Sequence, residues 1–232
     1  MITNRIYNIA KQIFPINRSI TGKGTEKTLK ILKTIVPKLK IKKIKSGKKV
    51  FDWSIPPEWN VKEAYIKDKF GKKIIDIKRN NLHLVGYSEP VNLLLKKKDI
   101  FKKINSITEQ PNAIPYITSY YKKYWGFCAS EYQKKKIKKD YKDSDLFEVK
   151  VDSNYNKNGK LNYGEIIIPG KSRKEILIST YVCHPQMANN ELSGPIVSIA
   201  LAKYFLKRKN KKTIRFIFVP ETIGAIAYIQ KN

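Results

Sequence analysis

Two residues whose side chains bind metals and move protons stand at matching places in the last third of the chain. His184 follows the apolar run 176–182 by two residues, and Glu221 follows the apolar run 213–219 by two residues. Imidazole is a common zinc ligand, and a carboxylate can take a proton from a water molecule that a metal has activated. This pairing is typical of metal-dependent hydrolysis, provided that the fold brings the two side chains together.

The elements around these residues predict that it does. Residues 192–206 have the length and composition of a helix, and a second helix opens near Thr222, which gives a β-α-β-α order. A right-handed crossover makes the two strands parallel, so their carboxyl ends lie at one edge of the sheet. Open α/β sheets collect their chemistry at that edge. We therefore expect His184 and Glu221 to converge.

The polar loop 187–191 offers further oxygen ligands, among them Asn190 and Glu191. The same loop opens the predicted helix, where Asn189, Asn190 and Ser193 are ordinary capping residues. The residues alone leave a metal site and a plain helix start as alternatives.

The rest of the chain divides by its texture. We expect helices over residues 4–14 and from a cap at Thr25 to residue 36, both in an amino-terminal part, 1–50. Residues 51–152 form a β-rich domain, with a strand pair around Gly71 and a short strand that carries His83 in a structural role. A hairpin turn is predicted at 156–159, between strands 146–152 and 161–169. Residues 153–232 complete the α/β core.

Composition excludes several classes of protein. The formal charge of +29 arises from 48 basic and 19 acidic residues, but only six of the basic residues are arginine and the lysines are spread from end to end. Base recognition relies on arginine, so we expect no specific nucleic-acid partner. No apolar run is long enough for a membrane helix, and we expect a cytoplasmic protein. The two cysteines, Cys128 and Cys183, are expected to be packed thiols.

Several separated blocks also carry a resemblance to a known family. In chain order they are Phe14–Gly24, Lys49–Trp59, Tyr120–Cys128, Ser179–Pro185 and Val219–Tyr228. Together they resemble a bacterial aminopeptidase-like family that has an inserted β-rich domain of unknown function and is related to the zinc aminopeptidases of the aminopeptidase Y type. The resemblance runs nearly from end to end.

The resemblance implies an α/β fold with a phosphorylase/hydrolase-like parallel-sheet core, in which zinc and Glu221 activate water to remove the amino-terminal residue of a peptide. His184 would be a zinc ligand, with Asn190 and Glu191 as further candidates. Asn190 stands where these enzymes have an aspartate that bridges two metals, and Thr222 stands where they have a second glutamate. A neutral amide is a poor bridge between cations, so the activity of this chain is in question.

The resemblance also places later ligands beyond Asn232, so we expect an amino-terminal fragment with an incomplete core that is inactive by itself. Three hypotheses stay open. The chain is a metallo-aminopeptidase, a degenerate scaffold without catalysis or, third in order, a basic nucleic-acid-binding module. The sequence predicts no oligomeric state.

Overall fold

The computed structural model describes residues 2–231, with side chains from Ile6 onward, and the chain forms two compact units. The first unit contains the residues up to Glu58 and those from Asn156 onward. The second unit is Trp59–Tyr155. Among the described residues, no helix is long and apolar enough to cross a membrane.

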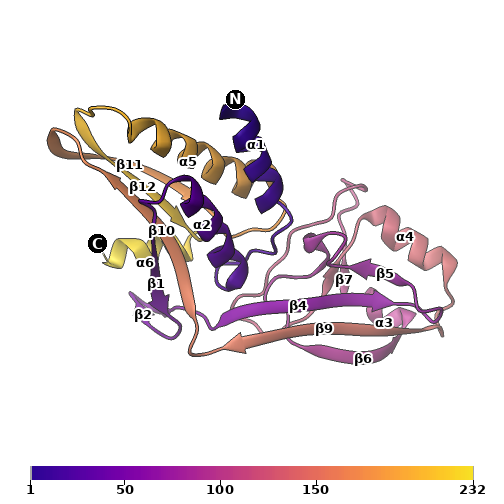
Figure 1. The fold of residues 1–232 in the computed structure, drawn as a ribbon. Coiled ribbons are helices and arrows are strands. Elements are labelled where there is room, and N and C mark those ends of the chain that lie inside the picture. Colours follow the sequence, from indigo (N-terminus) through magenta and orange to yellow (C-terminus); the bar gives the residue numbers. More distant parts are fainter. Residues whose placement is uncertain (1, 232) are drawn as a thin grey trace. The chain divides into compact units, whose positions relative to one another are not determined.

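A four-stranded mixed sheet forms the centre of the first unit (Figure 1). Its strands, in spatial order, are β1 (Lys40–Lys45), β10 (Lys160–Ile168), β12 (Lys212–Val219) and β11 (Ser172–Tyr181). The β1–β10 and β10–β12 pairs are antiparallel, and the β11–β12 pair is parallel. The predicted parallel pair is therefore present, and two antiparallel strands extend the sheet on one side.

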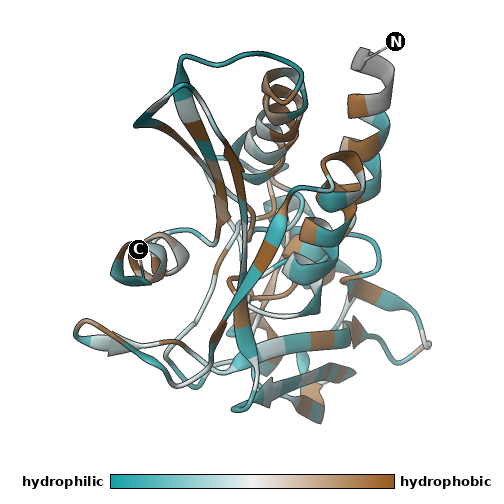
Figure 2. Cartoon of the chain, turned by 60° about the vertical axis from the view of Figure 1, so that its left-hand side comes forward, coloured by the Kyte–Doolittle hydropathy of each residue, from teal (hydrophilic) through white to brown (hydrophobic). Residues whose placement is uncertain are grey.

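Helices cover both faces of this sheet (Figure 2). Phe216 and Phe218 of β12 point to a core shared with α1 (Ile2–Ile13), α2 (Lys23–Ile35) and α5 (Ser193–Phe205). Ile217 and Val219 alternate to the other face, which α6 (Ile223–Lys231) and the hairpin of β2 (Lys49–Val50) and β3 (Trp53–Ser54) cover. This alternation along β12 positions one helical layer on each side.

The predicted helix cap at Thr25 is wrong. Helix α2 begins at Lys23 after Gly22, and no side chain caps it. Thr25 lies inside the helix, and its hydroxyl instead donates to the Ser19 carbonyl of the preceding loop at 2.5 Å. Gly24 explains the arrangement, because a Cβ at this position would lie 1.8 Å from the Asn17 carbonyl oxygen. The close approach of the preceding loop therefore sets the helix start.

The second unit is built on an antiparallel-rich sheet in the order β5, β4, β9, β6. Its bounds are β4 (Glu58–Lys67), β5 (Lys73–Asp76), β6 (Val91–Lys96) and β9 (Leu146–Asn156), and the smaller elements are the 3₁₀ turn η1 (Asn81–His83), α3 (Lys97–Phe101), β7 (Ile104–Asn105), β8 (Phe127–Cys128) and α4 (Glu131–Asp140). The strand pair around Gly71 is present as β4 and β5. A reciprocal capping box between Ser130 and Gln133 starts α4.

Two predictions for this region are wrong. The turn at 156–159 exists, but β9 and β10 do not form a hairpin, because β9 pairs with β6 while β10 pairs with β1 and β12. His83 lies in the 3₁₀ turn and not in a strand. Its ring is buried, and its Nδ1 lies 2.7 Å from the Cys128 carbonyl oxygen, which is a structural contact.

Candidate metal centre

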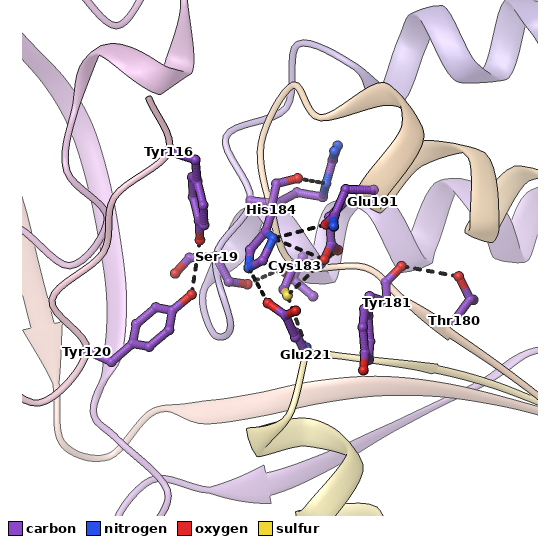
Figure 3. Close-up of polar contacts among 12 residues, drawn as sticks. Ser19, Tyr116, Tyr120, Thr180, Tyr181, Cys183, His184, Glu191 and Glu221 are labelled. Carbon is purple, nitrogen blue, oxygen red and sulfur yellow. Dashed lines mark hydrogen bonds and ion pairs between the residues drawn. The ribbon is translucent and has the colours of Figure 1, made fainter. Parts of the chain in front are cut away.

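The carboxyl ends of β11 and β12 bring two functional side chains to one edge of the sheet. The parallel register ends at Tyr181 opposite Val219, and the Val182 N–H donates to the Val219 carbonyl at 3.1 Å. Past this last bond the segments that follow β11 and β12 leave the sheet. His184 and Glu221 extend from the two strand ends, and the His184 Nε2 lies 3.1 Å from the Glu221 Oε2 (Figure 3).

The other side of the imidazole faces two more oxygen atoms. The His184 Nδ1 lies 3.1 Å from the Glu191 Oε1 and 3.3 Å from the Asn190 Oδ1. All four residues that the sequence singled out, His184, Asn190, Glu191 and Glu221, thus surround one ring. Asn190 directs its side chain to this ring, and α5 begins without a side-chain cap, unlike the plain helix start considered above.

A π-helical turn, η2 (Ala188–Leu192), delivers Asn190 and Glu191 together. Its extra residue per turn lets two successive side chains approach the same imidazole, and such turns recur at functional sites. The Glu191 side chain is fully buried, and its Oε2 accepts the Cys183 N–H at 2.6 Å. One carboxylate oxygen is therefore held by backbone while the other faces His184.

Cys183 is a member of this cluster that sequence reasoning missed. Its Sγ lies 3.7 Å from the Glu191 Oε1 and accepts the Glu221 N–H at 3.1 Å. Cys183, His184 and Glu191 offer ligand atoms within 4.8 Å of one another. Burial, reinforced by the Glu191 charge, raises the pKa of the Cys183 thiol well above its usual range. The thiol thus links Glu191 to the backbone of Glu221.

A buried cation supports the centre from the amino-terminal part of the chain. Arg18 is 1% exposed, and its Nε donates to the His184 carbonyl at 3.0 Å while its Nη1 donates to the Ile13 carbonyl at 2.7 Å. Burial lowers the pKa of Arg18 to about 10, and the negative charge of Glu191 opposes that decrease. Arg18 lies in the block Phe14–Gly24, but nothing within that block indicates a partner 166 residues away.

Backbone strain accompanies the site. Gln186 and Thr222 have φ angles of 48° and 50°, in the left-handed region that residues other than glycine rarely adopt. Gln186 lies two residues after His184, and Thr222 directly follows Glu221. Such conformations cost about 1–3 kcal/mol and persist where the surrounding contacts enforce them.

The separations of these donors from the His184 Nδ1 are compatible with a tetrahedral zinc ion. The atoms on the Nδ1 side are an imidazole nitrogen, a carboxylate oxygen and an amide oxygen, with separations from Nδ1 of 3.1 and 3.3 Å. Ligand atoms about 2.0–2.2 Å from a tetrahedral zinc lie about 3.3–3.6 Å apart, close to these separations. The amide is the weakest member, because it carries no charge.

Comparisons with known proteins agree with this architecture. Residues 7–232 match the family described as "Domain of unknown function (DUF4910)". A curated relative from Clostridium acetobutylicum is 44% identical over 227 residues, which are 98% of this chain and 51% of the relative. Its name refers to polysaccharide biosynthesis and to an aminopeptidase-like domain. The chain therefore spans about half the length of the curated relative.

Solved structures share the fold. A Clostridium acetobutylicum crystal structure described as a peptidase has a TM-score of 0.93 and 43% identity, and the match covers 99% of this chain and 53% of that one. A zinc aminopeptidase from Bacillus subtilis has a TM-score of 0.61 and 12% identity, over 98% of this chain and 64% of that one. At this low identity the second likeness concerns the fold alone, and it establishes the α/β aminopeptidase-like architecture.

Proposed function

The chain belongs to the DUF4910 family, and we propose that it contributes to the active centre of a zinc-dependent hydrolase that removes amino-terminal residues from peptides. The observation that carries the proposal is the imidazole of His184, which has the Glu221 carboxylate on one nitrogen and the Asn190 and Glu191 oxygens on the other. An imidazole between two carboxylates at a sheet edge suits metal chemistry better than packing.

The exposures of these groups divide their roles. The side chains of His184 and Glu191 are 6% and 0% exposed, whereas that of Glu221 is 39% exposed. Buried donors suit a ligand shell, because the protein holds them in place and excludes competing water, and the exposed Asn190 meets this requirement less well than His184 and Glu191. A general base must reach the water and the substrate, and Glu221 is exposed enough to do so, although its carboxylate would have to leave the His184 Nε2 to reach a water on the Nδ1 side.

Each residue then has a defined task. His184, Asn190 and Glu191 would hold the zinc, and the Cys183 N–H orients Glu191. Zinc supplies a Lewis acid that polarises a carbonyl and makes water acidic near neutral pH. Glu221 accepts the proton from the attacking water and returns it to the departing amine. The Glu221 N–H bond to the Cys183 Sγ fixes the backbone from which this base extends.

One observation favours a second candidate, a family member that keeps the fold without catalysis. Asn190 supplies an amide where carboxylate charge would hold a divalent ion, and Thr222 adds no charge beside Glu221. In that case the same arrangement of side chains is kept in a protein that acts as a non-catalytic scaffold. The nucleic-acid alternative has less support, since it rests on a net charge of +29 in which only six of the 48 basic residues are arginine, the residue on which base recognition relies.

The two histidines provide a matched experiment. Zinc affinity of the chain is measured by competition with a chromogenic chelator, for the wild type, His184→Ala and His83→Ala. His83 is equally buried but lies in the second unit against a carbonyl, so its loss should leave zinc affinity unchanged. His184→Ala should lower the affinity by about a hundredfold or more, as expected for loss of a ligand. Equal zinc binding by both variants contradicts the proposed centre.

Two further variants separate catalysis from scaffolding. Asn190→Asp should raise zinc affinity by about tenfold or more because it adds a ligand charge. Glu221→Gln should keep zinc affinity but abolish the release of amino-terminal residues from peptides. If the wild type and Asn190→Asp both bind zinc but release no residue from any peptide in a mixed library, the scaffold function replaces the enzyme.

A further inference from the structure

Cys183 presents its sulfur to the same carboxylate oxygen that faces the His184 ring. The Cys183 Sγ lies 3.7 Å from the Glu191 Oε1, and the His184 Nδ1 lies 3.1 Å from that oxygen. The ligand atoms of these three residues lie within 4.8 Å of one another, and Figure 3 shows the sulfur between Glu191 and Glu221. A thiol and an imidazole therefore meet at one carboxylate oxygen.

The position of this sulfur suits a metal ligand. Zinc binds sulfur at about 2.3 Å and carboxylate oxygen at about 2.0–2.2 Å, so at a tetrahedral angle the two atoms lie about 3.5–3.7 Å apart. The observed distance between the Cys183 Sγ and the Glu191 Oε1 is 3.7 Å. Cys183, His184 and Glu191 are all buried, whereas Asn190 is exposed. The thiol is thus better enclosed than the amide.

The charges around the centre support a negative sulfur once a cation is bound. Among the donors on the Nδ1 side only Glu191 carries a charge, and a thiolate at Cys183 would add the negative charge that Asn190 lacks. The carboxylates of Glu191 and Glu221 oppose a thiolate while no cation is present. The buried Arg18 acts electrostatically on both Glu191 and Cys183, and the Glu221 N–H donates to the sulfur at 3.1 Å. Both contacts stabilise a thiolate.

We propose, resting on the zinc centre proposed above, that the Cys183 sulfur is a zinc ligand and that Cys183, His184 and Glu191 form the buried part of the ligand shell. The exposed Asn190 amide is then the donor that water replaces most easily. As the metal–sulfur bond forms, the thiol proton passes to solvent, because a coordinating thiol is deprotonated. A thiolate ligand selects zinc over hard cations such as magnesium.

Cobalt(II) is the probe, because a cobalt–thiolate bond gives a near-ultraviolet charge-transfer band that nitrogen and oxygen ligands do not give. Titration of the chain should produce this band. Cys183→Ser should lose it and bind zinc about tenfold or more weakly. Serine keeps a hydroxyl that can accept the Glu221 N–H and donate to Glu191, so the comparison isolates the sulfur. The matched control is Cys128→Ser, since Cys128 is equally buried but lies in the second unit, and both readouts should be unchanged.

Cys128→Ser also leaves Cys183 as the sole cysteine, so a band in that variant assigns the sulfur even if Cys183→Ser fails to fold. The inference is overturned if cobalt binds without the band and Cys183→Ser holds zinc as tightly as the wild type. The zinc centre itself still stands in that case, provided that His184→Ala lowers the affinity. Absence of metal binding by the wild type overturns both. A band without peptide hydrolysis keeps the thiolate ligand and removes the enzyme.

Discussion

Arg18 joins the end of α1 to the loop that carries His184, and its replacement by methionine tests how that loop is held. Methionine fills a similar volume without donors. The change removes two hydrogen bonds, to the Ile13 and His184 carbonyls at 2.7 and 3.0 Å, from a side chain that is 1% exposed. Both carbonyls lose a charged donor in the interior.

The magnitude follows from these contacts. Hydrogen bonds to a charged group contribute about 1.5–3 kcal/mol each, which gives about 3–6 kcal/mol for the pair. Burial of the guanidinium opposes this, as the lowered pKa of about 10 shows, and its Nη2 has no hydrogen-bond partner among the described residues. We therefore expect the lower end of the range, about 3 kcal/mol, for Arg18→Met.

Two comparisons sharpen the assay, which is urea unfolding followed by circular dichroism. Arg18→Lys keeps the charge but lacks the planar fork that reaches two carbonyls, so it should lose about half as much as Arg18→Met. Thr25→Val removes one neutral hydrogen bond, to the Ser19 carbonyl of the same loop, and should cost about 1 kcal/mol. A loss below about 1 kcal/mol for Arg18→Met would show that the two charged bonds do not hold the loop.

Two further predictions concern ionisation away from the metal centre. Burial lowers the pKa of His83 below its ordinary value of 6.5, against the opposing effect of the Cys128 carbonyl, so the unfolded chain binds the proton more readily. The contribution of the neutral His83 to the free energy of unfolding should be fully present above pH 6.5. It should be lost as the pH falls from there through the lower folded-state pKa, by at most about 1.4 kcal/mol per pH unit. Urea midpoints should decline less steeply in His83→Gln. Glu165, buried against Lys42, Arg215 and Tyr228, should cost about 2–3 kcal/mol as Glu165→Gln. Glu175→Gln, which also loses a contact to Arg215 but at an exposed position, should cost less than about 1 kcal/mol, and equal urea midpoints for the two variants would contradict this account.

The part of the fold that sequence could predict is the part built from neighbouring segments. The parallel pair β11 and β12, the helix between them and the placement of His184 beside Glu221 all follow from local periodicity and the handedness of one crossover. The turn at 156–159 shows the limit. Its residues are those of a hairpin, but each flanking strand has partners far along the chain, and a local motif says nothing of them.

The same limit applies within the metal centre. Cys183 and Arg18 act through a thiol that accepts a backbone N–H and through a guanidinium that donates to a backbone carbonyl. Main-chain partners carry no residue type, so they leave no pattern in the sequence by which Cys183 or Arg18 could be paired with them. Residues that bind side chain to side chain, such as His184 with Glu191, are easier to predict because both partners are chemically distinctive.

This difference bears on what Asn190 changes. The Asn190 Oδ1 contacts the His184 ring at 3.3 Å, but the bonds that hold the Glu191 carboxylate, the His184 carbonyl and the Glu221 backbone N–H do not use the Asn190 side chain. The amide thus removes charge from the centre without removing its framework. A carboxylate placed there by Asn190→Asp would meet a frame that is already held, so its effect should appear in zinc affinity and only slightly in the positions of His184 and Glu221.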